Sequence, residues 1–296
     1  MRLARLVLAQ ATSWSAVVVA AAAGLAAVLT AVDGGGSLEP EAALAVGALR
    51  VPGLLVFLLP LLCGLAAGLA SARLLARGER LVLELAGVAP SSVAGLGCVA
   101  ALGLASLGWM VHDRVVPVAE SLADALGGHD EAPWVFLDGQ AVRVDDGTVV
   151  DIEGHAIVAV SQLPADRLDG PRLRAAEARQ RPARASVAVL QSADTRPART
   201  ELASRTARIL GAGLLAFFGW LPLARAPATQ VALTLGAGLT WAGADLALRA
   251  ASAQGRVSAT VGSWGAVLLA VGLVLVALAW CRRTRAPSGG EGLSAP

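Results

Sequence analysis

Few residues of this chain could carry out chemistry, and their spacing argues against catalysis. The three histidines, His112, His129 and His155, are not at metal-ligand spacing, whereas a zinc site needs about four ligands. All 24 basic residues are arginines, so the lysine-containing phosphate-binding loop of an ATPase is excluded. No serine lies in the nucleophile-elbow pattern of a hydrolase. We therefore predict no catalytic residue, no metal site and no cofactor.

A charged segment from Arg73 to Pro90 is better placed for docking, because it joins two apolar runs. Its charged residues alternate in sign, and apolar residues occupy the opposite side of a helix. The charged residues are Arg77, Glu79, Arg80 and Glu84, and the apolar ones are Leu81, Val82, Leu85 and Val88. This pattern predicts an amphipathic helix over 73–90 that Gly87 ends. The helix either lies among the lipid headgroups or is a coupling helix that inserts into a cytoplasmic ATPase, where Glu79 meets a basic residue.

The composition indicates a membrane protein with several spans. Hydrophobic residues make up 56% of the 296 residues and charged residues 16%, and the mean hydropathy is +0.65. The net charge of +2 is too small to favour a nucleic-acid partner. The cysteines lie in or beside apolar runs, so we expect no disulfide.

Six apolar stretches approach the roughly 20 residues that a spanning helix needs. They are Trp14–Val32, Val51–Ala72, Val93–Val111, Ile209–Ala224, Thr229–Leu248 and Val257–Trp280. Arginine is concentrated on the side of the N-terminus, which predicts that both termini are cytoplasmic. That side holds Arg2, Arg5, Arg73, Arg77, Arg80, Arg225, Arg282, Arg283 and Arg285, against Arg50, Arg249 and Arg256 in the outer short loops.

The polar segment between the third and fourth spans, residues 113–208, is predicted to form a small outer β-domain. Its β-prone runs are Trp134–Leu137, Ala141–Val144, Thr148–Ile152, Ala156–Leu163 and Ser186–Gln191, with hairpin turns at Asp138-Gly139 and Asp146-Gly147. The expected organisation has spans in 1–112, the β-domain in 113–208, spans in 209–285 and a disordered tail in 286–296. The coupling helix over 73–90 lies within the first unit.

Small and ionisable residues inside the spans have competing interpretations. Gly64 and Gly68 favour close helix packing within the chain over a contact between subunits. Asp245 and Arg249 are functional candidates because they are ionisable residues in a predicted span. They are also spaced for an ordinary i,i+4 ion pair, and both interpretations stand.

Several short motifs, taken in order, resemble the LptF/LptG family, the membrane permeases of the lipopolysaccharide transporter. The resemblance covers the whole chain and depends on the order and spacing of the motifs rather than on any one of them. The motifs are Pro60 with Gly64 in the second span, Arg77-Gly-Glu79 before Leu83 and Gly87-Val88-Ala89, Val115-Val116-Pro117 after the third span, Trp134-Val135 before Asp138-Gly139, Thr200-Glu201-Leu202 before Arg205, and Trp264.

The resemblance implies a six-span α-helical protein of the bacterial inner membrane with a periplasmic, jellyroll-like β-domain between spans three and four. The implied function is a permease that extracts lipopolysaccharide. The implied partners are a cytoplasmic nucleotide-binding ATPase dimer, a second LptF/LptG-like permease subunit, a single-span periplasmic bridge protein of the LptC type, and the lipid itself. The residues implied to couple the protein to the ATPase are Arg77, Glu79, Arg80, Glu84 and Gly87.

The chain departs from the family in two places. Its outer segment is short, which indicates a divergent member, and Asp33 lies where one subunit type has basic residues near lipid phosphates. Asp33, Asp245 and Arg249 are the candidate gate or intramembrane polar residues, because the first and fifth spans line the gates in the family. Two alternatives stay open: a permease for another envelope lipid or lipoprotein, and a membrane scaffold that binds an envelope partner without transport.

Overall fold

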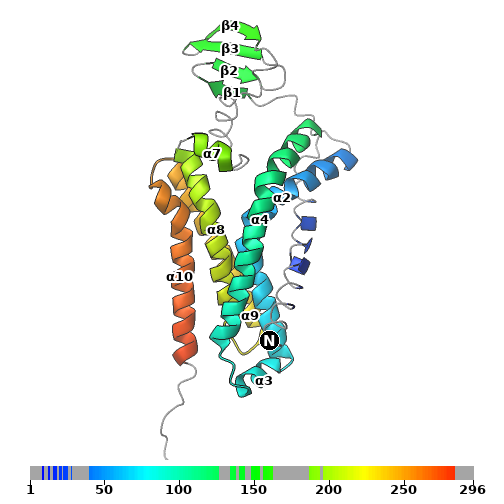
Figure 1. Ribbon diagram of the computed structural model, residues 1–296, viewed down its shortest axis with the longest axis vertical. Coiled ribbons are helices and arrows are strands. Elements are labelled where there is room, and N and C mark those ends of the chain that lie inside the picture. Colours follow the sequence, from blue (N-terminus) through cyan, green and yellow to red (C-terminus); the bar gives the residue numbers. More distant parts are fainter. Residues whose placement is uncertain are drawn as a thin grey trace, which may run out of the picture.

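The computed structural model describes residues 40–126, 134–137, 140–143, 148–153, 156–162, 187–193 and 196–283, with scattered residues between 9 and 28 (Figure 1). Several predictions lie outside the described residues. These are Asp33, most of the first span, the two hairpin turns, residues 163–186 and the tail over 286–296.

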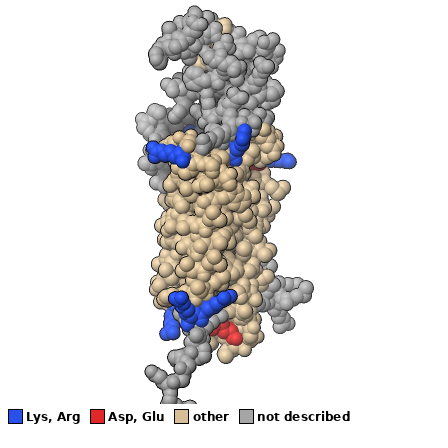
Figure 2. All heavy atoms as spheres, turned by 90° about the vertical axis from the view of Figure 1, so that its left-hand side faces the viewer, with Lys and Arg blue, Asp and Glu red and all other residues tan. Residues whose placement is uncertain are grey.

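The described residues form mainly helices, and four of these are long and apolar enough to cross a membrane. They are α2 (Pro40–Ala76), α4 (Pro90–Leu126), α9 (Pro227–Ala253) and α10 (Ala259–Arg283). On the face shown in Figure 2, arginine side chains gather near both ends of the helical part and leave uncharged surface between them. Length, apolarity and charge placement agree on a membrane protein, as predicted.

Helix α8 (Arg196–Trp220) packs against α2, α4, α9 and α10 and so occupies the centre of the helical part. The predicted fourth span, Ile209–Ala224, corresponds to the second half of this helix, which ends four residues early at Trp220. Its first half carries several charges, and α8 is not among the four apolar helices. The count of six spans therefore stays a prediction.

Glycines allow α2 to lie close to α8 and α9. A Cβ added to Gly64 would lie 3.0 Å from Leu215 Cβ, and one added to Gly68 would lie 2.6 Å from Thr234 Oγ1. From the other side, a Cβ on Gly219 would lie 2.6 Å from the carbonyl oxygen of Gly64. The predicted packing of Gly64 and Gly68 within the chain is thus confirmed.

Helices α2 and α4 both extend beyond the predicted spans, and each has 37 residues. Helix α2 begins at Pro40 rather than near Val51, and α4 continues past Val111 to Leu126. The predicted boundary at residue 113 therefore falls inside a continuous helix. Inside this helix, the Asp113 carboxylate contacts polar groups of α7 (Val187–Ala193) and α8.

A four-stranded antiparallel sheet lies between α4 and α8 in the chain, in the order β1-β2-β3-β4 (Figure 1). The strands are β1 (Trp134–Leu137), β2 (Gln140–Arg143), β3 (Thr148–Glu153) and β4 (Ala156–Gln162). They coincide with the first four β-prone runs to within one residue. The register shifts between Asp151 and Ile152, which marks a bulge in the β3–β4 pair. The jellyroll assignment stays a prediction.

The fifth predicted strand, Ser186–Gln191, is wrong, because its described residues, 187–191, are part of helix α7 (Val187–Ala193). The first backbone N–H groups of a helix have no partner within it. Here the Val187 N–H donates to Asp113 Oδ1 at 2.7 Å, and Leu190 is buried. A residue 74 positions away thus supplies a partner for the first N–H group of this helix.

Candidate functional site

The charged segment forms a shorter helix than predicted, α3 (Glu79–Leu85), because α2 continues to Ala76 and a turn follows. Gly78 has a φ of 70°, a left-handed conformation that glycine adopts readily, and it separates the two helices. At the other end Gly87 has a φ of 75°, and the Gly87 and Val88 N–H groups donate to the carbonyls of Glu84 and Leu83. The prediction that Gly87 ends the helix is confirmed.

Three of the four residues on the predicted apolar side do not pack into the helical part. Leu81, Val82 and Leu85 are 61%, 65% and 80% exposed, whereas Leu83 and Val88 pack against the core. Two exposed ion pairs join the predicted charges: Arg80 Nε lies 3.3 Å from Glu84 Oε1, and Arg77 Nη1 lies 3.6 Å from Glu79 Oε1. Exposed pairs of this kind add little stability. The helix therefore presents side chains for contact.

Helical geometry gives α3 two different exposed faces, because successive residues are about 100° apart. Arg80, Leu81 and Glu84 fall within one arc, and all three line a groove of about 640 Å³. Glu79, Val82 and Leu85 fall on a second arc that points away from that groove. We call these the groove face and the outer face of α3.

The groove lies between α3, the turn from α8 to α9 and the end of α10. Its lining includes Leu75 of α2, the segment Pro222–Arg225, and Trp280 with Cys281 of α10. Trp280 is 58% exposed, and Arg282 and Arg283 follow it in the last turn of α10. The groove thus combines apolar walls with arginines at one end of the helical part.

Gln230, which the sequence did not single out, fixes the turn that forms one wall of the groove. Its side-chain oxygen accepts hydrogen bonds from the N–H groups of Leu223 and Ala224 at 3.1 and 3.2 Å. Its amide nitrogen donates to the carbonyls of Gly219 and Leu221 at 2.9 and 2.8 Å. All four bonds hold a non-helical segment in place, so the wall is built before any ligand arrives.

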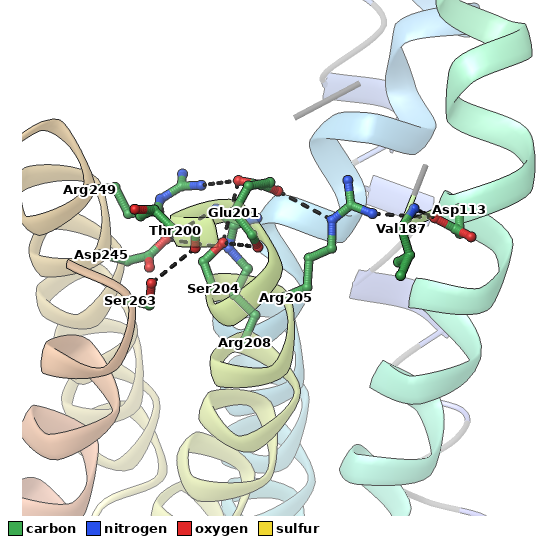
Figure 3. Close-up of polar contacts among 10 residues, drawn as sticks. All are labelled: Asp113, Val187, Thr200, Glu201, Ser204, Arg205, Arg208, Asp245, Arg249 and Ser263. Carbon is green, nitrogen blue, oxygen red and sulfur yellow. Dashed lines mark hydrogen bonds and ion pairs between the residues drawn. The ribbon is translucent and has the colours of Figure 1, made fainter. Parts of the chain in front are cut away.

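A second polar site, the ion-pair cluster, lies toward the start of α8 (Figure 3). It consists of Asp113 on α4, Glu201, Arg205 and Arg208 on α8, and Asp245 and Arg249 on α9. The predicted i,i+4 pair is confirmed, with Arg249 Nε 3.3 Å from Asp245 Oδ2.

The same Asp245 oxygen also accepts from Arg208 of the neighbouring helix, at 3.3 and 3.4 Å. Asp245 is only 1% exposed. Glu201 in turn contacts Arg249 at 3.2 Å and Arg205 at 3.5 Å, and Arg205 reaches Asp113 at 3.3 Å. The cluster therefore connects three helices through buried or half-buried charges.

Aromatic rings and hydroxyls extend the ion-pair cluster to two more helices. The Arg208 guanidinium lies 4.6 Å from the centre of the Phe57 ring of α2, a cation–π contact. Ser263 of α10 donates to the Thr200 carbonyl at 2.9 Å. The sequence offered one signal for this larger set, the spacing of Glu201, Arg205 and Arg208 along one helix face.

The described residues hold no group of three or more His, Cys, Asp or Glu side chains that could bind a metal. His112 is buried with its ring 4.6 Å from that of Trp109, and His129 and His155 lie outside the described residues. No model of a known protein family and no curated protein matches this chain.

Proposed function

We propose that this protein is the membrane permease subunit of an ATP-driven lipid exporter, and that the outer face of α3 docks a cytoplasmic ATPase. The observation that carries the proposal is the exposure of Val82 and Leu85 on a seven-residue helix held between two long apolar helices. Exposed apolar residues beside charges are typical of protein contact surfaces. The resemblance to LptF/LptG assigns the docking of the ATPase to the segment that forms α3, and it supports lipopolysaccharide as the cargo.

The short connections of α3 favour mechanical coupling. Only Arg77 and Gly78 separate α3 from α2, and four residues separate it from α4. A force applied to α3 by an ATPase would therefore act directly on the ends of two long helices. The ion-pair cluster, about a third of the way along α8, would keep α4, α8 and α9 moving together.

Lipid export needs an energy source outside this chain. Each CH₂ group buried in a bilayer is worth about 0.8 kcal/mol, so extraction of roughly 40 of them costs on the order of 30 kcal/mol. The proposed assembly supplies this energy through an ATPase dimer and offers the lipid an apolar path between two permease subunits. An LptC-like bridge protein would then receive the lipid at the β-domains.

Co-purification of the full chain from its native membrane tests this proposal. We expect a nucleotide-binding subunit with ATPase activity in the complex, and its loss in Leu85→Asp and in Glu79→Arg. Arg256→Glu is the matched control, since Arg256 is exposed in the turn between α9 and α10. Purification without any ATPase, or equal recovery of the ATPase with all three variants, would contradict the proposal and favour a scaffold.

The cargo is tested separately, by mass spectrometry of lipids that remain on the purified complex. Enrichment of lipopolysaccharide over the membrane average is expected. Enrichment of a different envelope lipid or of a lipoprotein would support a permease function but identify a different cargo.

A further inference from the structure

We infer that the groove beside α3 binds the headgroup of an anionic phospholipid, with its phosphodiester on Arg80 and Arg225. This site is distinct from the outer face of α3 and does not depend on the ATPase. It would make α3 a two-sided element, with a lipid on the groove face and a protein on the outer face.

The charges that line the groove match a ligand with one negative charge. Arg80 and Arg225 contribute two positive charges and Glu84 one negative charge, so the lining carries a net charge of +1. Arg282 and Arg283 lie next to the lining residues Trp280 and Cys281 in the chain and add to the positive potential. Arginine suits a phosphodiester because its planar guanidinium donates two parallel hydrogen bonds.

Arg225 is available for such a ligand. It is exposed and forms no ion pair within the described part of the chain. Arg80 also lines the groove, with its Nε 3.3 Å from Glu84 Oε1. Both guanidinium groups are thus on the lining of the groove, where they can contact the ligand.

The apolar part of the lining favours a lipid over a free phosphate. Leu75, Leu81, Leu223 and Trp280 share the groove with the two arginines. Tryptophan is enriched at the boundary between bilayer and water, and basic pockets between spans bind anionic headgroups. The volume of about 640 Å³ lies within the roughly 300–1,000 Å³ of small-molecule sites.

Two backbone N–H groups in the wall of the groove already have partners, which leaves the arginine side chains as its charged donors. The N–H groups of Leu223 and Ala224 donate to Gln230, so neither is free for a phosphate. The two arginines are therefore the anion-binding groups, and their substitution should remove the preference for charge without removing the groove.

The test uses the full chain in detergent, offered equal amounts of phosphatidylglycerol and phosphatidylethanolamine, with retained lipid counted by native mass spectrometry. Wild type should retain phosphatidylglycerol preferentially. Arg225→Glu should lower that retention by roughly tenfold, the value of one charge-assisted hydrogen bond. Arg256→Glu makes the same charge change in the turn between α9 and α10 and should have no effect.

Three results would overturn the inference: equal retention of the two lipids by wild type, an equal loss with Arg256→Glu, or full displacement of the lipid by millimolar inorganic phosphate. Leu85→Asp separates this site from the docking surface. It should keep the bound phosphatidylglycerol even where it abolishes contact with the ATPase, and loss of the lipid in this variant would contradict the two-sided arrangement.

Discussion

The two polar regions of this protein contain the same kinds of residues and use them in opposite ways. At α3, the Arg80–Glu84 pair is exposed and lies beside exposed leucines. In the ion-pair cluster, Asp245 and Arg208 are buried and join two helices. Water screens the first pair, whereas burial shields the second pair from solvent. Charge at one region is exposed and open to the proposed contact, whereas charge at the other joins helices.

The largest loss of stability is expected when one residue of the ion-pair cluster is substituted. Asp245→Ala leaves the Arg208 guanidinium buried without its carboxylate, and loss of one partner of a buried pair costs about 3–5 kcal/mol. We expect a large drop in the midpoint of thermal unfolding, followed by circular dichroism in detergent.

A double variant, Asp245→Leu with Arg208→Met, provides the control. It removes both charges and should recover much of the lost stability, because apolar residues of similar size replace many buried pairs without loss. If the double variant is less stable than Asp245→Ala, the cluster contributes attraction beyond charge compensation.

An intermediate loss of stability is expected for a substitution at the contact between α8 and α2. In Gly219→Ala the added Cβ would lie 2.6 Å from the Gly64 carbonyl oxygen, and backbone on the facing helix leaves little room. Overpacking of this kind costs about 1–3 kcal/mol. Chemical denaturation of the purified variant would measure it.

Gly272 of α10 is the matched control, since a Cβ there meets nothing within 4 Å. Gly272→Ala should leave stability unchanged or raise it by up to roughly 1 kcal/mol, because alanine is the better helix former. Equal destabilisation by the two alanines would show that close packing does not explain Gly219.

The smallest effect on stability is expected at α3. Glu84→Ala removes the exposed pair with Arg80, which is worth about 0–1 kcal/mol. The same unfolding measurement as for Asp245→Ala makes the comparison direct. A loss of stability similar to that of Asp245→Ala would contradict the proposed difference between the exposed pair at α3 and the ion-pair cluster.

The sequence predicted those features that depend on neighbouring residues. Gly87 was expected to end a helix, and the spacing of Asp245 and Arg249 was expected to give a pair, because both follow from contacts within one helical turn. The first four strands were found for a similar reason, since alternating residues and turn signals are local.

Features that depend on distant residues were missed. Helix α7 was taken for a strand because the carboxylate that binds its first N–H belongs to Asp113. The pairing of Arg208 with Asp245 needs the packing of α8 against α9. One local feature also differs from the prediction, since the left-handed backbone at Gly78 divides the predicted helix over 73–90.

The lengths of α2 and α4 have a geometric consequence for any motion that begins at α3. At 1.5 Å per residue, a helix of 37 residues is roughly 55 Å long, nearly twice the thickness of about 30 Å of a bilayer core. If such a helix tilts as one rod by about 5° around its end at α3, its other end sweeps about 5 Å, the rise of one helical turn. A small rotation on one side of the membrane would thus become a displacement of side-chain size well beyond the opposite surface.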